Sequence, residues 1–296
     1  MTMRITQGMM ANQSLRNIQA NQARMQTLED QITSGTQITK PSDDPIGAAQ
    51  ALSLQESLDQ NTQFGRNIDQ GTSWLNSSDA ALSSVTDAIH RARELAVQAA
   101  NGSLTPADRS AIQAEVTQLQ HHVLDLSNSK YGQYFLFSGT RSDQPGYTQY
   151  NPSTTAGAYQ GNSGQVLREI SPAVVTNVNV DPTSTFDPVF QAMNQLQTGL
   201  TSGDSAAVSA SLASFDTALD AVSLARAQVG ARVNRLDALK QRQDGVSVNL
   251  SGLLSNVKDV DMAKAITSFT TAQTVYQASL KASAQMMQIS LLDYLK

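Results

Sequence analysis

The sequence predicts a mainly α-helical protein with a small β-rich insertion, and three observations support this fold class. Apolar residues near both ends of the chain recur at helical spacing. Between the two ends, an acceptor side chain followed by proline marks several helix starts. A segment rich in glycine and proline, residues 134–187, interrupts the helical pattern. These features predict paired terminal helices in a coiled coil, a helical bundle and a projecting β-rich domain.

The two terminal segments, residues 3–33 and 259–293, each carry one apolar stripe on an otherwise polar helix. Because two narrow stripes can bury each other, we predict that these helices pair. The pattern alone leaves open a second interpretation, in which two ordinary helices dock separately on a globule. The candidate assembly residues are Leu15, Ile18, Met25, Leu28, Ile32, Ile266, Phe269, Tyr276, Leu280, Met287 and Leu291.

The helix starts between the termini follow one local rule. An acceptor side chain can cap the free N–H groups of a first turn, and proline suits the first helical position. Three dipeptides fit this rule, so Asp44, Thr105 and Asp187 are the predicted caps. The predicted inner helices span residues 44–101 with a break near Asn76, 106–130, 187–199 and 204–254.

The segment 134–187 differs from the helices around it. Glycine and proline are frequent, and Val174, Thr176, Val178 and Val180 alternate with other residues as in a strand. We therefore predict three domains. They are residues 1–43 with 255–296 as a terminal coiled-coil assembly domain, residues 44–133 with 188–254 as a helical bundle, and residues 134–187 as the β-rich domain.

Composition restricts the function. The net charge of −5 argues against a nucleic-acid surface, which needs a clustered basic face. The chain has no cysteine, which excludes disulfides and thiolate chemistry. No stretch has the roughly 18 consecutive apolar residues of a membrane span, and we expect no membrane insertion. Aromatic residues make up only 5% of the chain, which favours long thin helices over a thick core.

The candidate chemical groups do not form a recognisable catalytic or metal site. His121 and His122 are adjacent, so on a helix they point about 100° apart, and His90 lies on another predicted helix. Asp43 and Asp44 resemble an acid/base pair, but the following proline gives them a capping role. We expect no catalytic residue, no metal and no cofactor, and therefore not an enzyme.

Four sequence blocks resemble the flagellin superfamily. They are Ser34–Gly47, Leu75–Leu82 running into Arg91–Gly102, Gly230–Leu236, and the C-terminal block from Asp259 to Lys296. Within the superfamily, Asp43-Asp44-Pro45 and Tyr134–Thr140 are more similar to the junction proteins between hook and filament than to flagellin itself. The resemblance implies a structural role in the bacterial flagellum.

The resemblance also implies partners and a location. The implied partners are the first hook-associated protein, flagellin, other copies of the same chain in a ring, and a cytoplasmic flagellar export chaperone. The implied location is the extracellular hook–filament junction, reached by type III export without a cleaved signal peptide. One alternative is a short flagellin that forms the filament itself, and another is an intracellular helical scaffold.

The sequence also suggests how such a subunit folds. A long helix with one narrow apolar stripe is unstable alone, so we predict that both termini are largely unfolded in the free subunit and fold on assembly. Gly230 lies within a predicted helix, where glycine costs about 1 kcal/mol relative to alanine. We expect this glycine to permit close helix packing.

Overall fold

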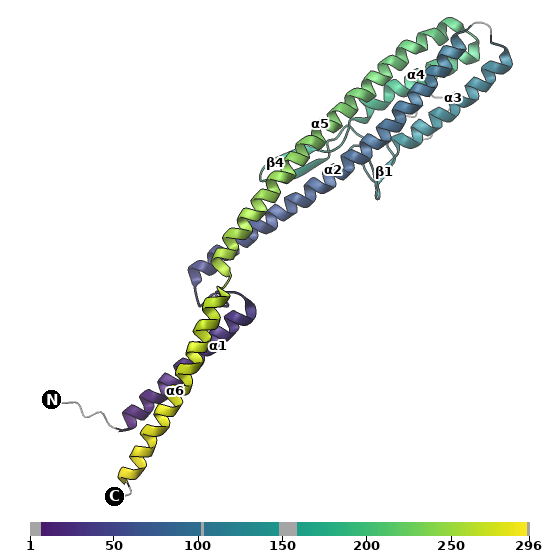
Figure 1. Ribbon diagram of the computed structural model, residues 1–296. Coiled ribbons are helices and arrows are strands. Elements are labelled where there is room, and N and C mark those ends of the chain that lie inside the picture. Colours follow the sequence, from purple (N-terminus) through teal and green to yellow (C-terminus); the bar gives the residue numbers. More distant parts are fainter. Residues whose placement is uncertain (1–6, 102–103, 148–158, 295–296) are drawn as a thin grey trace. The chain divides into compact units, whose positions relative to one another are not determined.

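The computed structural model describes residues 7–101, 104–147 and 159–294, and it is mainly helical, as predicted (Figure 1). Contacts divide the chain into two compact units, residues 1–60 with 246–296 and residues 61–245. The described helices are α1 (Gln7–Ser34), α2 (Pro45–Ala100), α3 (Pro106–Ser127), α4 (Pro182–Ser202), α5 (Ser205–Lys258) and α6 (Met262–Tyr294). Between α3 and α4 the described residues form four short strands.

In the first unit, α1 and α6 lie side by side (Figure 1). Gly35 ends α1 with φ of 70°, a left-handed conformation that suits glycine after a helix. The amide of Gln37 then donates to the carbonyl of Lys258 at 2.6 Å, and the amide of Val260 donates to the carbonyl of Gly35 at 3.0 Å. These bonds join the end of α1 to the start of α6, so the two helices run antiparallel.

Helix α2 begins where the sequence predicts and continues without interruption. Asp44 Oδ1 accepts the amides of Ile46 at 3.1 Å and Gly47 at 3.0 Å, which caps the first turn. The break predicted near Asn76 is wrong. Leu75 and Ser78 are fully buried in the bundle core, which holds this stretch in the helix, and Ser77 and Ser78 satisfy their hydroxyls on carbonyls four residues earlier.

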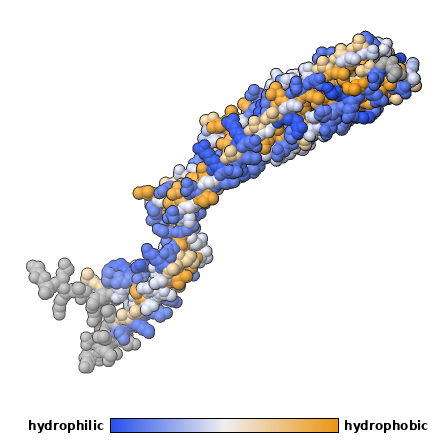
Figure 2. All heavy atoms as spheres, turned by 45° about the horizontal axis from the view of Figure 1, so that its top comes forward, coloured by the Kyte–Doolittle hydropathy of each residue, from blue (hydrophilic) through white to orange (hydrophobic). Residues whose placement is uncertain are grey.

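The second unit has a continuous apolar core formed by α2, α3, α4 and α5. Its fully buried side chains include Leu75, Leu82, Ile89, Val116, Val123, Phe190, Leu196, Phe215 and Val222. Figure 2 shows hydrophobic and hydrophilic residues interspersed on the visible face of this unit. The bundle therefore buries its apolar side chains within one chain.

A row of polar side-chain pairs joins α3 to α4, and we call it the polar ladder. It consists of Gln113–Thr201 at 2.9 Å, Thr117–Gln197 at 2.8 Å and Gln120–Asn194 at 2.7 Å. The positions rise by four and three residues along α3 and fall by four and three along α4. Antiparallel helices match such steps only in one alignment, so the polar ladder fixes the register of the two helices.

The prediction that Asp187 caps a helix is wrong. Helix α4 begins six residues earlier, with Asp181 at the N-cap position and Pro182 in the first turn. The longer helix fully buries Phe186, whose ring packs edge to face on Phe137 with centroids 4.9 Å apart. This burial outweighs the backbone hydrogen bond that Pro188 forfeits inside the helix.

The insertion contains two small antiparallel hairpins, β1 (Lys130–Tyr131) with β2 (Tyr134–Phe135) and β3 (Leu167–Ser171) with β4 (Val174–Asn177). The predicted alternation holds only in part. Alternation would place Val174 and Thr176 on one face, yet Val174 is exposed and Thr176 is buried, whereas Val178 and Val180 are both buried but lie beyond the end of β4.

Where the backbone of the insertion is not paired with a strand, asparagine side chains bind its N–H and C=O groups. Asn128 accepts the amide of Tyr147 at 3.0 Å and donates to its carbonyl at 2.9 Å. Asn179 binds the amide of Val166 at 2.9 Å and the carbonyl of Gly164 at 3.0 Å in the same way. The insertion is therefore ordered by side-chain amides that act as substitutes for a neighbouring strand.

Candidate assembly interface

The predicted stripe on α1 is only partly covered. Leu15 is 54% exposed, and Ile18, Met25, Leu28 and Ile32 are half-buried. Asn21 lies on the same face of α1, and its Nδ2 donates to Ser279 Oγ of α6 at 3.2 Å. This face of α1 therefore turns toward α6. Helix α1 therefore contacts α6 and still presents apolar surface.

The stripe on α6 behaves in the same way. Ala265 and Ala272 are the buried apolar residues in its described part, whereas Ile266 is 49% exposed and Leu280 is 42% exposed. Phe269 and Tyr276 are half-buried. The side chains of Met287 and Leu291 lie outside the described residues. Small alanines thus make the close contact, and the large apolar side chains stay at its edge.

Further apolar residues are exposed where α2 begins and where α5 ends. Ile46 is 82% exposed and Val248 is 75% exposed, and Leu52 and Leu253 are exposed as well. Single exposed apolar residues are common on protein surfaces, but a set of them in one unit indicates a surface that a partner covers. The first unit therefore differs from the bundle, whose large apolar side chains are mostly buried.

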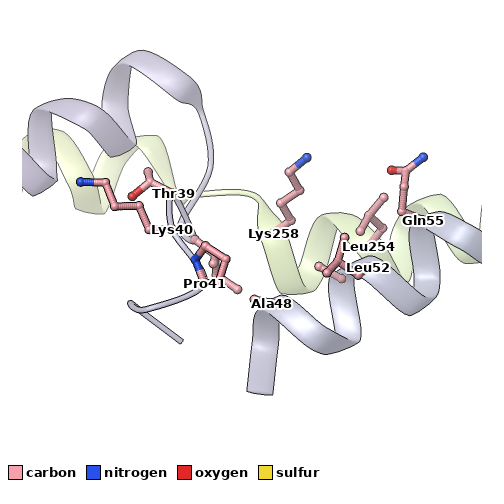
Figure 3. Close-up of a pocket in the computed structure, with 10 residues that line it drawn as sticks. Thr39, Lys40, Pro41, Ala48, Leu52, Gln55, Leu254 and Lys258 are labelled. Atoms are coloured by element: carbon pink, nitrogen blue, oxygen red, sulfur yellow. The ribbon is translucent and has the colours of Figure 1, made fainter. Parts of the chain in front are cut away.

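An open groove of about 210 Å³ lies among these residues (Figure 3). The loop before α2 contributes Thr39 to Pro41, α2 contributes Ala48 to Gln55, and α5 contributes Leu254 and Lys258. In Figure 3 the side chain of Lys40 points away from α2. The floor of the groove is apolar, and its charged groups are lysines of the loop and of α5.

Asp43 and Gly47 shape the loop beside this groove. Asp43 Oδ2 accepts the Thr39 hydroxyl at 2.8 Å and the Lys40 amide at 3.0 Å. The Thr39 hydroxyl is the main cause that lowers the pKa of the Asp43 carboxyl. A Cβ on Gly47 would collide with Asp44 Oδ2 and lie 2.7 Å from Ile38 Cδ1, so a larger residue there would have to displace these two side chains. Two of the three predicted caps hold at their helices, Asp44 at α2 and Thr105 at α3.

The third predicted cap, Asp187, has a different role, because it anchors the insertion. The buried Tyr147 hydroxyl donates to the Pro182 carbonyl at 3.0 Å and to Asp187 Oδ1 at 3.2 Å. Burial raises the pKa of Tyr147 and, to about 12, that of Tyr159. Burial also raises the pKa of the Asp187 carboxyl. Sequence reasoning missed this cluster, because a lone tyrosine in a loop carries no local signal.

The described residues also bear on two other kinds of site. Within them, no group of three or more His, Asp or Glu side chains is arranged to hold a metal ion. None of the helices among them has the length and apolar character needed to cross a membrane.

Comparisons with known proteins agree with this architecture. The model of the bacterial flagellin N-terminal helical region matches residues 5–142, and that of the C-terminal helical region matches residues 212–295. The chain is 27% identical to flagellar hook-associated protein 3 of Escherichia coli, over 99% of this chain and 100% of the relative. It is 29% identical to the flagellar filament 30.7 kDa core protein of Treponema maltophilum, over 90% and 89%.

The fold also has solved counterparts. The crystal structure of Bacillus cereus FlgL superposes with a TM-score of 0.60 at 23% identity, covering 69% of this chain and 99% of that one. The two family models together cover most of the chain and match both of its helical ends in the correct order. The chain therefore belongs to the bacterial flagellin family of structural proteins.

Proposed function

We propose that the chain is the adaptor that joins the hook of the bacterial flagellum to its filament. The observation that carries the proposal is the match to E. coli hook-associated protein 3, which covers essentially the whole of both chains. The filament core protein of T. maltophilum is matched over less of either chain, at similar identity. That match favours a second candidate function, a short flagellin that forms the filament itself.

The partners follow from this role. The hook-side partner is the first hook-associated protein, the filament-side partner is flagellin, and copies of the chain form a ring between them. An export chaperone binds the chain in the cytoplasm, and the chain leaves by the flagellar type III route without a cleaved signal peptide. The exposed apolar residues of α1 and α6, such as Leu15 and Ile266, support an assembly surface in this unit.

Each of the three predicted domains would have its own structural role in this function. Residues 1–43 with 255–296 would form the assembly domain and residues 44–133 with 188–254 the bundle. Residues 134–187 would form the third domain, which packs against the bundle through the β3–β4 hairpin and whose last residues begin α4. The assembly domain buries few large side chains in one subunit, so its folding is coupled to burial against neighbouring subunits. Unfolded termini would also pass through a narrow export channel.

Immunogold electron microscopy of intact cells tests the adaptor role. An antibody against the insertion should label a narrow band at the far end of the hook. Label along the whole filament would instead show a flagellin, and label confined to the cytoplasm would contradict export. Polymerisation of the purified chain gives an independent measurement, because an adaptor should stay monomeric or form small oligomers, whereas a flagellin should form long filaments.

A further inference from the structure

The groove beside the start of α2 has a basic end. Among its described lining residues, Lys40 of the loop and Lys258 of α5 are charged and none is acidic. In Figure 3 the side chains of Lys258 and Gln55 point to the same side. The ion pairs that the described residues form lie between residues 69 and 240, and neither groove lysine takes part in one. Two cations therefore border an apolar groove without a carboxylate in direct contact.

The carboxylates nearest to these lysines in the sequence are bonded to other donors. Asp43 Oδ2 accepts the Thr39 hydroxyl and the Lys40 amide, and the charge of Lys40 is only a lesser cause of its lowered pKa. Asp259 Oδ2 accepts the Ser255 hydroxyl at 2.6 Å. These carboxylates hold turns of their own subunit, which leaves both ammonium groups available to a partner.

The same face of α2 becomes acidic one turn beyond the groove. Ala48, Leu52 and Gln55 line the groove at helical spacing, and Asp59 continues this row. Gln55 Nε2 donates to Asp59 Oδ1 at 3.1 Å, and Glu56 lies beside them. Both acids are exposed, and neither forms an ion pair with another described residue. This face therefore changes from basic through apolar to acidic along the helix.

The acidic end of this face on one copy matches the basic end on another. Asp59 follows Ala48 by eleven residues, or roughly 16 Å along the helix at 1.5 Å per residue. A parallel copy displaced by that distance brings its Glu56 and Asp59 to the level of the two groove lysines. Two different patches then meet, so the contact is heterologous, which is the type of contact that can close into a ring.

We propose that the groove receives the acidic turn Glu56–Asp59 of a second, parallel copy of this chain. The proposal rests on the proposed function in one respect, because the copies of a ring point the same way. The contact pairs opposite charges and covers Leu52, which is 69% exposed in the single subunit. An antiparallel pair of copies would match the same charges, but it would close on itself as a dimer.

A crosslink between introduced cysteines tests this docking directly, because the chain has no cysteine of its own. The variant Lys258→Cys with Asp59→Cys replaces the wild type in cells, and isolated flagella are treated with a short bismaleimide. Electrophoresis with an antibody against the chain should show dimers, trimers and higher multimers, since each copy is linked to two neighbours. Each single-cysteine variant should remain monomeric. Dimers alone would show the antiparallel pair, and monomers alone would show that the two sites do not meet; either result would overturn the proposal.

An exchange of charges gives an independent measurement. Lys40→Glu with Lys258→Glu should lower incorporation into flagella roughly tenfold, because like charges then meet across the contact. Glu56→Lys with Asp59→Lys, added to the same chain, should restore incorporation, since every contact again pairs opposite charges. Incorporation that stays low in the fourfold variant, while circular dichroism shows the same melting temperature as in the wild type, would contradict the docking.

A matched control separates the contact from a general effect of charge. Arg235→Glu with Arg242→Glu changes the net charge by the same amount on exposed residues of α5 in the other unit, and it should incorporate as the wild type does. Immunogold labelling distinguishes the docking from the adaptor role. Multimers from a chain that labels the whole filament would support the docking and contradict the adaptor role, whereas label at the end of the hook without multimers would do the reverse.

Discussion

At the scale of single residues, two glycines have opposite surroundings, one crowded and one open. Gly139 has φ of 65°, and a Cβ there would collide with the carbonyl of Asn162. Gly230 lies within α5, is exposed, and has no described atom within 4 Å of the place where a Cβ would lie. The expectation that Gly230 permits close helix packing in the bundle is therefore wrong for the single subunit.

We predict that Gly230→Ala stabilises the free subunit. In an exposed helix interior, alanine is favoured over glycine by about 1 kcal/mol, and here the added methyl group meets open space. Urea denaturation followed by circular dichroism should show a higher midpoint with an unchanged slope.

Gly139→Ala is the contrasting control for that experiment. The left-handed backbone and the collision with Asn162 should make this variant less stable than the wild type. A destabilised Gly230→Ala variant would show that the helix packs against something that the single-chain structure does not contain.

Local chemistry explains which residues could be predicted from the sequence. Asp44 and Thr105 cap helices as predicted, because an acceptor side chain before proline favours the start of a helix. Asp187 has the same local signal, but the burial of Phe186 shifts the start of α4 to Pro182. Tertiary burial of this kind cannot be read from a dipeptide.

At the scale of elements, the start of α3 is a complete capping box. The Thr105 hydroxyl accepts the Asp108 amide at 3.2 Å, and Asp108 Oδ2 accepts the Thr105 amide at 3.1 Å and the Thr105 hydroxyl at 2.6 Å. The hydroxyl is the larger of the two Thr105 contributions that lower the pKa of the Asp108 carboxyl. The charged carboxylate therefore stabilises the first turn of the helix.

This lowered pKa predicts a pH dependence. A carboxyl whose pKa falls on folding contributes stability above its unfolded pKa, near 3.8, and that stability is lost as pH decreases through the folded value. Wild type should thus exceed Asp108→Asn in stability at pH 7, and the difference should diminish below about pH 4.

Urea denaturation at a series of pH values measures this difference. Asp125→Asn removes a carboxylate from the same helix outside the capping box and serves as the control. A difference between wild type and Asp108→Asn that stays constant to pH 3 would contradict the assigned role of the carboxylate.

The elements also show where sequence reasoning stops. The long helices follow from apolar periodicity and capping, so their existence is predictable. The insertion is ordered by Asn128, Asn162 and Asn179, whose partners are backbone groups far along the chain or across a loop. In the sequence, an asparagine that faces solvent cannot be told from one that binds the backbone of a distant segment. The roles of these three asparagines could therefore not be predicted.

At the scale of the whole molecule, the two units bury apolar surface differently. Residues 61–245 enclose a core of fully buried side chains, whereas the described part of the α1–α6 pair buries two alanines and leaves Ile266 and Leu280 more than 40% exposed. The periodicity of the sequence indicates that each of these helices carries an apolar stripe. It cannot predict how much of each stripe the subunit covers by itself, because that depends on the partner.

We therefore predict that Ile266→Ser with Leu280→Ser impairs assembly without affecting the bundle. Both side chains are exposed in the single subunit, so the free energy of unfolding should change by less than about 0.5 kcal/mol. Incorporation into flagella, counted by immunogold labelling, should fall strongly, and swimming should be reduced.

Leu224→Ser provides the matched control, because Leu224 is 62% exposed but lies on α5 in the other unit. This variant should assemble and swim as the wild type does. Normal incorporation of the double variant would show that the exposed stripe is not the assembly surface.

The polar ladder between α3 and α4 has a consequence for how this chain can vary. The three side-chain pairs and the buried apolar residues of both helices align α3 with α4, so the length of the segment between Ser127 and Pro182 does not have to set their alignment. The exposed turn at Gly132, between β1 and β2, can therefore lengthen or shorten during evolution while the bundle keeps its alignment. The same property makes this turn a suitable place to graft a foreign peptide.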